Sequence, residues 1–234
     1  MAAMTSRPRA SATLLLVALA LIAGCGGAGG GSTAATTEPA NTDANTTPAA
    51  AKRPQLGPSF GSMTSLPGAL NSAPPWAANN ASAALQLRLR KIGLEPLREE
   101  GQVVHIHQHL DLYVDGSKVT VPANIGIDAG QGFISDLHTH DATGILHVES
   151  PTQQSFSLGQ FFAVWGVPLS PDCIGSRCAK GSRKLRVWVD GAEVTADPTR
   201  IVLAEHQQIA IAYGTAAQAP DPVPASYDFA AASL

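Results

Sequence analysis

Aromatic and charged residues are scarce in this sequence, and this scarcity limits the classes of function that the protein can have. Only 5% of the residues are aromatic and 14% are charged, the formal net charge is −3, and Lys and Arg are scattered rather than clustered. Nucleic-acid-binding domains concentrate Lys and Arg on one surface, so we expect no nucleic-acid partner. The apolar run at residues 14–22 is too short to span a bilayer stably as a helix.

The N-terminus instead has the three parts of a secretory signal. Basic residues precede the apolar run, which ends in a Leu-Ile-Ala-Gly-Cys sequence at Cys25. This ending resembles the lipobox of bacterial lipoproteins, which implies removal of residues 1–24 as a signal peptide and lipidation of Cys25. We therefore expect an exported protein that a lipid anchors to a membrane of the cell envelope. The alternative is an ordinary signal peptide that is cut elsewhere.

Cysteine is also scarce, with three residues in the chain. Lipidation of Cys25 would leave Cys173 and Cys178, which we expect to form a disulfide in an oxidising compartment. Four residues separate them, so they match neither a C-x-x-C redox motif nor a paired zinc knuckle. Metal ligation by these two thiolates is the weaker alternative.

Composition divides the rest of the chain into three parts. Residues 25–78 are rich in Gly, Ala, Thr, Pro and Asn with hardly any periodic apolar residues, which predicts a disordered tether after the lipidated cysteine. Residues 216–234 are expected to be a disordered tail for the same reason. Between them, residues 79–215 have the size of one domain with a single core.

Residues 79–215 predict a mainly β domain. Alternating apolar residues predict strands at 103–114, 118–121, 201–203 and 208–213 and a hairpin over 133–149, and Asp-Gly pairs at 115–116 and 190–191 mark two further hairpin turns. Helical patterns occur at 81–92, with Asn79 or Asn80 as the cap, and at 157–165. We expect an antiparallel sandwich or small barrel built from hairpins, with two short helices; an α+β fold is the alternative.

Histidine clustering is the main functional signal, because six of the seven histidines fall between positions 105 and 147. His105, His107 and His109 alternate with apolar residues, so all three project from one face of a strand. We expect at least one of them to join a second histidine group in the next hairpin.

That second group follows from the register of the hairpin over 133–149. If residues 141–144 form its turn, His138 faces His147, His140 lies beside them, and Asp136 faces Glu149 at the rim. Side chains two apart on a strand, or opposite across a pair, can meet around one ion that lies about 2 Å from each nitrogen.

The donors predict a transition-metal ion, with zinc, copper and iron all open, because imidazole and carboxylate disfavour calcium and magnesium. The leading interpretation is a protein for metal capture, transfer or tolerance. The alternatives are a hydrolase or oxygenase with Glu149, Asp136 or Asp141 as general base, a structural ion in a binding module, or a metal-free, pH-sensitive histidine network. His206 is expected to be an ordinary exposed residue. No protein partner can be predicted.

Three segments carry a wider resemblance. Residues 105–110 (HIHQHL), 121–127 (VPANIGI) and 138–144 (HTHDATG) together resemble an uncharacterised family of exported His-rich bacterial proteins. The resemblance spans most of residues 94–166. The resemblance supports the position of the domain in the chain, but it does not imply any activity.

Overall fold

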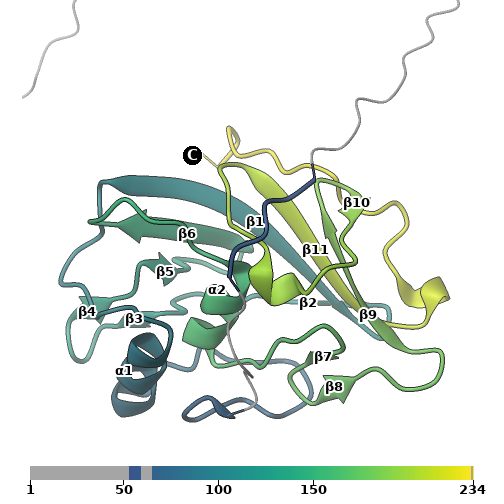
Figure 1. Cartoon of the computed structure of the whole chain (residues 1–234), viewed down its shortest axis with the longest axis horizontal. Helices are drawn as coiled ribbons and strands as arrows, with labels where there is room; N and C mark the ends of the chain where they lie inside the picture. The colour runs from purple at the N-terminus through teal and green to yellow at the C-terminus, as the bar shows by residue number, and fades with distance from the viewer. Residues whose placement is uncertain (1–52, 59–64, 233) are drawn as a thin grey trace, which may run out of the picture. The chain divides into compact units, whose positions relative to one another are not determined.

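A computed structural model describes residues 53–58, 65–232 and 234, and one mixed β-sheet lies at its centre (Figure 1). The strands are ordered β10-β9-β11-β1-β6-β5, and β2 also pairs with β1. Their bounds are β1 (Val104–Val114), β2 (Ser117–Val119), β5 (Leu137–His138), β6 (Ile145–Ser150), β9 (Lys184–Val189), β10 (Ala192–Glu193) and β11 (Gln207–Gly214). Two small sheets pair β3 (Ile127–Asp128) with β4 (Phe133–Ile134), and β7 (Cys173–Ile174) with β8 (Arg177–Cys178).

The mainly β class with two short helices is confirmed, and the sheet differs from the expected one in two respects. It is mixed rather than antiparallel throughout, because β1 and β11 run parallel with Leu110 opposite Ile209. In the described part of the chain it is also open rather than a closed barrel, since its path ends at β10 and β5. Alternating burial is the same for a parallel and an antiparallel neighbour, so the sequence pattern did not reveal the direction.

One face of the sheet packs on the helices α1 (Ser82–Lys91) and α2 (Leu158–Trp165), which lie below it in Figure 1. Helix α2 forms as predicted: Ser157 and Gln160 make a capping box at its start, and Gly166 ends it in the left-handed conformation with φ of 81°. Every residue of α2 is buried. The buried apolar side chains of this sheet face include Leu110, Leu112, Leu146, Val148, Val187, Val189, Ile209 and Ile211.

Helix α1 corrects one prediction. Neither Asn79 nor Asn80 caps it, because the N-cap is Ala81 and makes no side-chain cap hydrogen bond. Asn80 instead holds the 121–127 segment, donating to the Asn124 carbonyl and accepting from the Gly126 amide. Within the helix, Arg88 is fully buried and donates to the Val164 carbonyl of α2.

The opposite face of the sheet is partly covered by the C-terminal segment. Ala219 and Val223 pack against Trp188, Ala210 and Ala212 of the sheet, after the 3-10 helix η3 (Ala216–Gln218). Further along, the Tyr227 ring stacks on His109 with centroids 3.9 Å apart, and Phe229 is buried. The described residues of 216–234 therefore belong to the folded unit rather than to a disordered tail. The prolines of this segment limit regular structure, and its two aromatic side chains supply the apolar surface that anchors it.

Folded structure also extends N-terminal to the predicted domain boundary at residue 79. Trp76 is 3% exposed and packs edge-to-face on Trp165, with ring centroids 6.0 Å apart. Leu66 is buried as well, and the Gly57 amide donates to the Arg200 carbonyl. These parts of the expected tether therefore pack on the domain. The signal peptide, Cys25 and residues 26–52 lie outside the described residues.

Both Asp-Gly hairpin turns are confirmed, and each turn has positive φ at its two central residues. The angles are 53° and 85° at residues 115 and 116, and 50° and 78° at residues 190 and 191, as type I′ turns require. The two hairpins lie on either side of β11 in the sheet. The strand expected at 201–203 is reduced to isolated bridges. These bridges follow directly after the 3-10 helix η2 (Pro198–Arg200).

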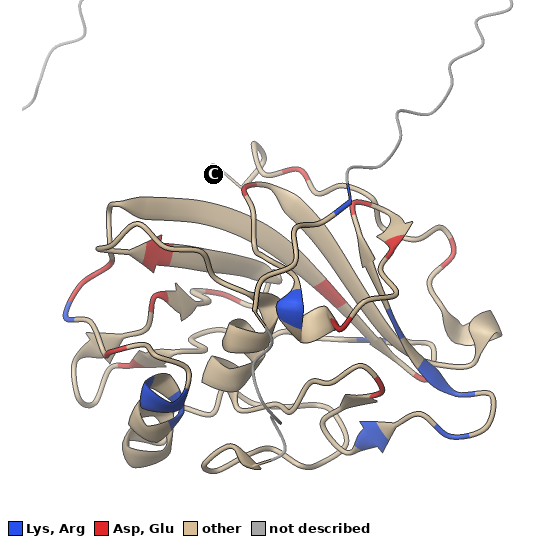
Figure 2. Cartoon of the chain, viewed as in Figure 1, with Lys and Arg blue, Asp and Glu red and all other residues tan. Residues whose placement is uncertain are grey.

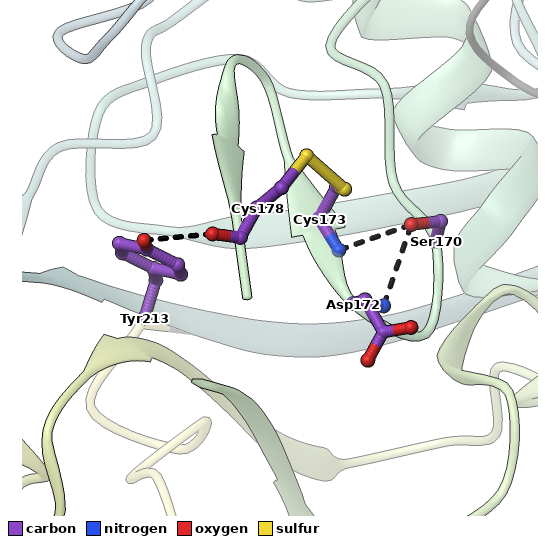
Figure 3. Close-up of a disulfide and its surroundings, with 5 residues drawn as sticks. All are labelled: Ser170, Asp172, Cys173, Cys178 and Tyr213. Atoms are coloured by element: carbon purple, nitrogen blue, oxygen red, sulfur yellow. Dashed lines mark hydrogen bonds between the residues drawn. A yellow bond between two sulfur atoms is a disulfide. The ribbon is translucent and has the colours of Figure 1, made fainter. Parts of the chain in front are cut away.

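The predicted disulfide joins Cys173 and Cys178, which lie opposite each other on β7 and β8 (Figure 3). The Tyr213 hydroxyl donates to the Cys178 carbonyl over 2.9 Å, and the Ser170 hydroxyl accepts from the Cys173 amide over 3.0 Å. Both sulfurs are thus used, which removes them as metal ligands. Among the described residues, no helix is long and apolar enough to cross a membrane.

Candidate metal centre

The histidines gather on the sheet face opposite the helices, across the three neighbouring strands β5, β6 and β1. The predicted pairing of His138 with His147 is confirmed, and His147 in turn lies opposite His107 on β1. The three imidazoles therefore form one row across the sheet. In the same register His105 lies opposite Glu149.

The loop between β5 and β6 is held against β1 by a glycine. Gly144 has φ of 95°, and its carbonyl accepts from the Leu110 amide over 2.8 Å. A Cβ at this position would lie 2.7 Å from the Leu110 carbonyl oxygen, so only glycine allows this approach. Asp141 closes the loop by accepting from the Thr143 amide and hydroxyl. The loop thereby fixes His140 and His147 relative to β1.

The segment at residues 121–127 supports β5 from its free edge. The Thr139 amide donates to the Ile125 carbonyl, and the Thr139 hydroxyl accepts from the Ile125 amide and donates to the Pro122 carbonyl. A Cβ on Gly126 would lie 2.5 Å from the Leu137 carbonyl oxygen, so this contact also needs glycine. The three segments that carry the sequence resemblance thus meet at one place.

The first group of metal-ligating side chains is His138, His140, His147 and Glu149, which could hold a metal ion because each offers a ligand atom within 4.8 Å of the others. His138 is fully buried, and its Nδ1–H donates to the Ser135 carbonyl over 3.0 Å. With the proton on Nδ1, Nε2 of His138 is unprotonated and carries a lone pair. It lies 3.2 Å from Nε2 of His140. Two nitrogens bound to one tetrahedral zinc lie about 3.3 Å apart, given bonds of about 2.0–2.1 Å.

Glu149 supplies the negative charge of this group. It is 2% exposed and accepts a hydrogen bond from Nδ1 of His147 over 3.1 Å, and its buried Oε2 atom has no hydrogen-bond partner in the described part of the chain. A carboxylate that orients an imidazole in this way is the usual neighbour of a metal-bound histidine. Figure 2 shows how rare charge is here: β1 and β6 each carry a single acidic residue, Asp111 and Glu149.

The second group is His105, His107 and Glu149, whose ligand atoms also lie within 4.8 Å of one another. His107 is buried, and no described residue forms a hydrogen bond with its Nε2 atom. The His107 ring meets the His147 ring edge-to-face with centroids 4.7 Å apart, so the two groups adjoin. Only Glu149 belongs to both.

Burial keeps the inner histidines uncharged, which a metal ligand requires. Desolvation, followed by the neighbouring histidines, lowers the pKa of His107 to about 4. Desolvation also lowers the pKa of His138 to about 4, although Glu149 acts in the opposite direction. For Glu149, desolvation raises the pKa, but the hydrogen bond from His147 and the nearby histidines outweigh it, so the net pKa is lowered.

His109 lies outside both groups, although its spacing in the sequence matched that of His105 and His107. Its Nδ1 is 2.8 Å from Oε1 of Gln208, and its Nε2 is 3.0 Å from the Thr143 carbonyl. Both nitrogens are therefore used within the protein, and the ring is covered by Tyr227. His109 holds the sheet, the hairpin loop and the C-terminal segment together.

The remaining predicted carboxylates also lie outside the two groups. Asp136 is buried, and desolvation raises its pKa despite a hydrogen bond with Ser150. Asp141 is engaged by Thr143 in the exposed loop. His206 is exposed as predicted, and its Nε2 is 2.9 Å from Glu205.

One nearby residue was missed by the sequence analysis. Oε1 of Glu100 lies 3.3 Å from Nε2 of His140, which brings a further carboxylate to the outer side of the first group. Glu100 precedes β1 and belongs to no periodic pattern, so no sequence signal points to it.

Comparisons with known proteins do not extend this description. No protein-family model matches the chain, and no curated protein or solved structure is significantly similar to it. The geometry of the histidine and glutamate side chains therefore carries the functional argument.

Proposed function

We propose that this protein is a cell-envelope lipoprotein that binds a transition-metal ion through His138, His140, His147 and Glu149. One observation carries the proposal. The Nε2 lone pair of buried His138 points at a neighbouring imidazole nitrogen 3.2 Å away, beside a buried carboxylate oxygen that has no partner. A cation between these atoms would satisfy all of them at once.

A metal-free histidine network fits these contacts less well. Without an ion, Glu149 Oε2 remains buried and has no hydrogen-bond partner among the described residues. Each such atom costs about 1–3 kcal/mol of desolvation free energy. Imidazole and carboxylate donors favour zinc, copper(II) or iron over calcium and magnesium.

The positions of the three candidate carboxylates favour a metal-binding role over a catalytic one. Glu149 belongs to the ligand set, whereas Asp136 and Asp141 lie outside it, so none of the three candidate general bases is free beside the first group. Three imidazoles and one carboxylate fill a tetrahedral ion. We infer a role in metal capture, transfer or tolerance.

Access from solvent supports capture as well. The His140 side chain is 44% exposed, and a hollow of about 430 Å³ beside His140 and His147 is bordered by Tyr227. Metal can therefore reach the buried His138 and Glu149 by way of His140. A lipid-anchored protein would present this opening in the envelope.

The anchor is tested at Cys25. Changing Cys25→Ser removes the only atom that the lipid can modify in a lipobox, so the variant should leave the membrane fraction or accumulate unprocessed. Fractionation of cells followed by mass spectrometry of the N-terminus measures both. Unchanged membrane partition and processing would exclude lipidation at this residue.

The metal site is tested most cleanly with His140→Ala. His140 is a ligand candidate with a largely exposed side chain, so its removal should change the stability of the metal-free protein by only about 0.5 kcal/mol. We expect the rise in melting temperature on adding zinc to shrink strongly. Thermal unfolding of protein purified without a His tag or chelator, together with elemental analysis, provides the measurement.

The matched control is His206→Asn, which removes an exposed imidazole outside both groups and keeps a residue that tolerates the positive φ of 58°. It should respond to zinc as the unaltered protein does. If the unaltered protein holds no stoichiometric metal, and zinc, copper and iron all leave its melting temperature unmoved, the proposed function is wrong.

A further inference from the structure

We propose that a second transition-metal ion binds between His105, His107 and Glu149, and that Glu149 bridges it to the ion held by the first group. This inference rests on the proposed function, because it adds a second ion to the same site. It assigns a ligand role to His107, the one buried imidazole in the row that the first group does not use.

The second group contains a buried nitrogen without a hydrogen-bond partner within the described structure, although Oε1 of its Glu149 already accepts a hydrogen bond from His147. His107 is 7% exposed, and its Nε2 has no hydrogen-bond partner among the described residues. A buried polar atom without a partner in a native fold requires an explanation such as an ion. His105 supplies a second nitrogen, with Nε2 3.5 Å from Oε1 of Glu149.

The carboxylate of Glu149 is oriented as a bridge. Its Oε1 atom faces His105 at 3.5 Å, and its Oε2 atom faces His138 at 3.9 Å. Oε1 also accepts the hydrogen bond from Nδ1 of His147 over 3.1 Å, so it lies between His105 of the second group and His147 of the first, whereas Oε2 lies on the side of His138. Ions that share a ligand in two-metal sites lie about 3.5–4 Å apart, a separation that one carboxylate spans.

The two ions would differ in their coordination. The first group offers four protein ligands, whereas the second offers two imidazoles and one carboxylate. A set of two histidines and one carboxylate is found at zinc and iron sites that keep open positions for water or another ligand. The His105 side chain is 45% exposed, so these open positions face solvent. The second ion is therefore the exchangeable one, and it can accept a small oxygen or nitrogen donor from outside.

A zinc titration of the full chain tests the second site. The unaltered protein should bind two equivalents of zinc by calorimetry and by elemental analysis after saturation. His105→Ala should bind one, and its melting temperature without metal should stay unchanged because the side chain is largely exposed. His206→Asn, a matched loss of an exposed imidazole, should still bind two.

Copper(II) tests the bridge itself. The first equivalent should give an electron paramagnetic resonance signal, and the second should diminish it through magnetic coupling across Glu149. Two equivalents with independent signals would overturn the bridge. One equivalent in the unaltered protein that His140→Ala loses and His105→Ala retains would overturn the second site and leave the first intact. No binding at all would overturn the proposed function instead.

Discussion

Changing Glu149→Gln is expected to abolish most metal binding, because this carboxylate belongs to both candidate groups. Gln keeps the size of the side chain and an oxygen that accepts the hydrogen bond from His147, but it removes the negative charge. At a free zinc concentration about 1,000 times the dissociation constant, binding stabilises the unaltered protein by about 4 kcal/mol. Denaturant unfolding with and without zinc should show that this increment is almost entirely lost in the variant.

The matched control for this change is Asp141→Asn. It replaces a carboxylate by an amide in the adjacent loop, and the amide oxygen can still accept from the Thr143 amide. Its zinc-dependent stabilisation should equal that of the unaltered protein. A Glu149→Gln variant that zinc stabilises fully would remove Glu149 from the site.

Acid is expected to unfold the metal-free protein cooperatively, because two buried histidines must stay neutral in the fold. The pKa of His107 and of His138 is lowered from 6.5 to about 4 in the folded state. Between these values the unfolded chain binds protons that the folded chain does not, so the free energy of unfolding falls as the pH falls from about 6.5 to about 4. The loss reaches about 3 kcal/mol for each histidine.

Urea unfolding of chelator-treated protein at several pH values in this window measures the effect. Replacing His138→Asn keeps a donor near the Ser135 carbonyl and removes the titrating ring, so the slope should become shallower by about 1.4 kcal/mol per pH unit. Glu149, whose pKa is lowered, adds a further loss below its unfolded value of about 4.5. A stability that is constant from about pH 6.5 to pH 4.5 would contradict the burial of neutral imidazoles.

Features that depend on neighbours in the sequence could be predicted. Helix α2 has its cap, its apolar residues and its terminal glycine within a short stretch, and both Asp-Gly turns are two residues long. The pairing of His138 with His147 followed from the length of the intervening loop. These local rules were sufficient to place the three histidines of the first group together, with Glu149 at their rim.

Features that depend on distant partners could not be predicted. The spacing of His109 matches that of His105 and His107, but Gln208 and the Thr143 carbonyl engage both of its nitrogens. Strand periodicity gives the direction of a side chain and not the groups that face it. The same limit applies to Tyr227, which lies in the segment predicted to be disordered, because its partner is the distant His109 ring.

The parallel pairing of β1 with β11 has a consequence for how the chain folds. Residues 108–114 pair with residues 207–213, which are synthesised about a hundred positions later. Strands β1 and β9 therefore each lack one neighbour until β11 is complete, and a loop of this length must close before the pairing gains free energy. We expect folding to be slow for a domain of this size. A nascent chain would expose the edge of β1, so it would need protection from aggregation until β11 is complete.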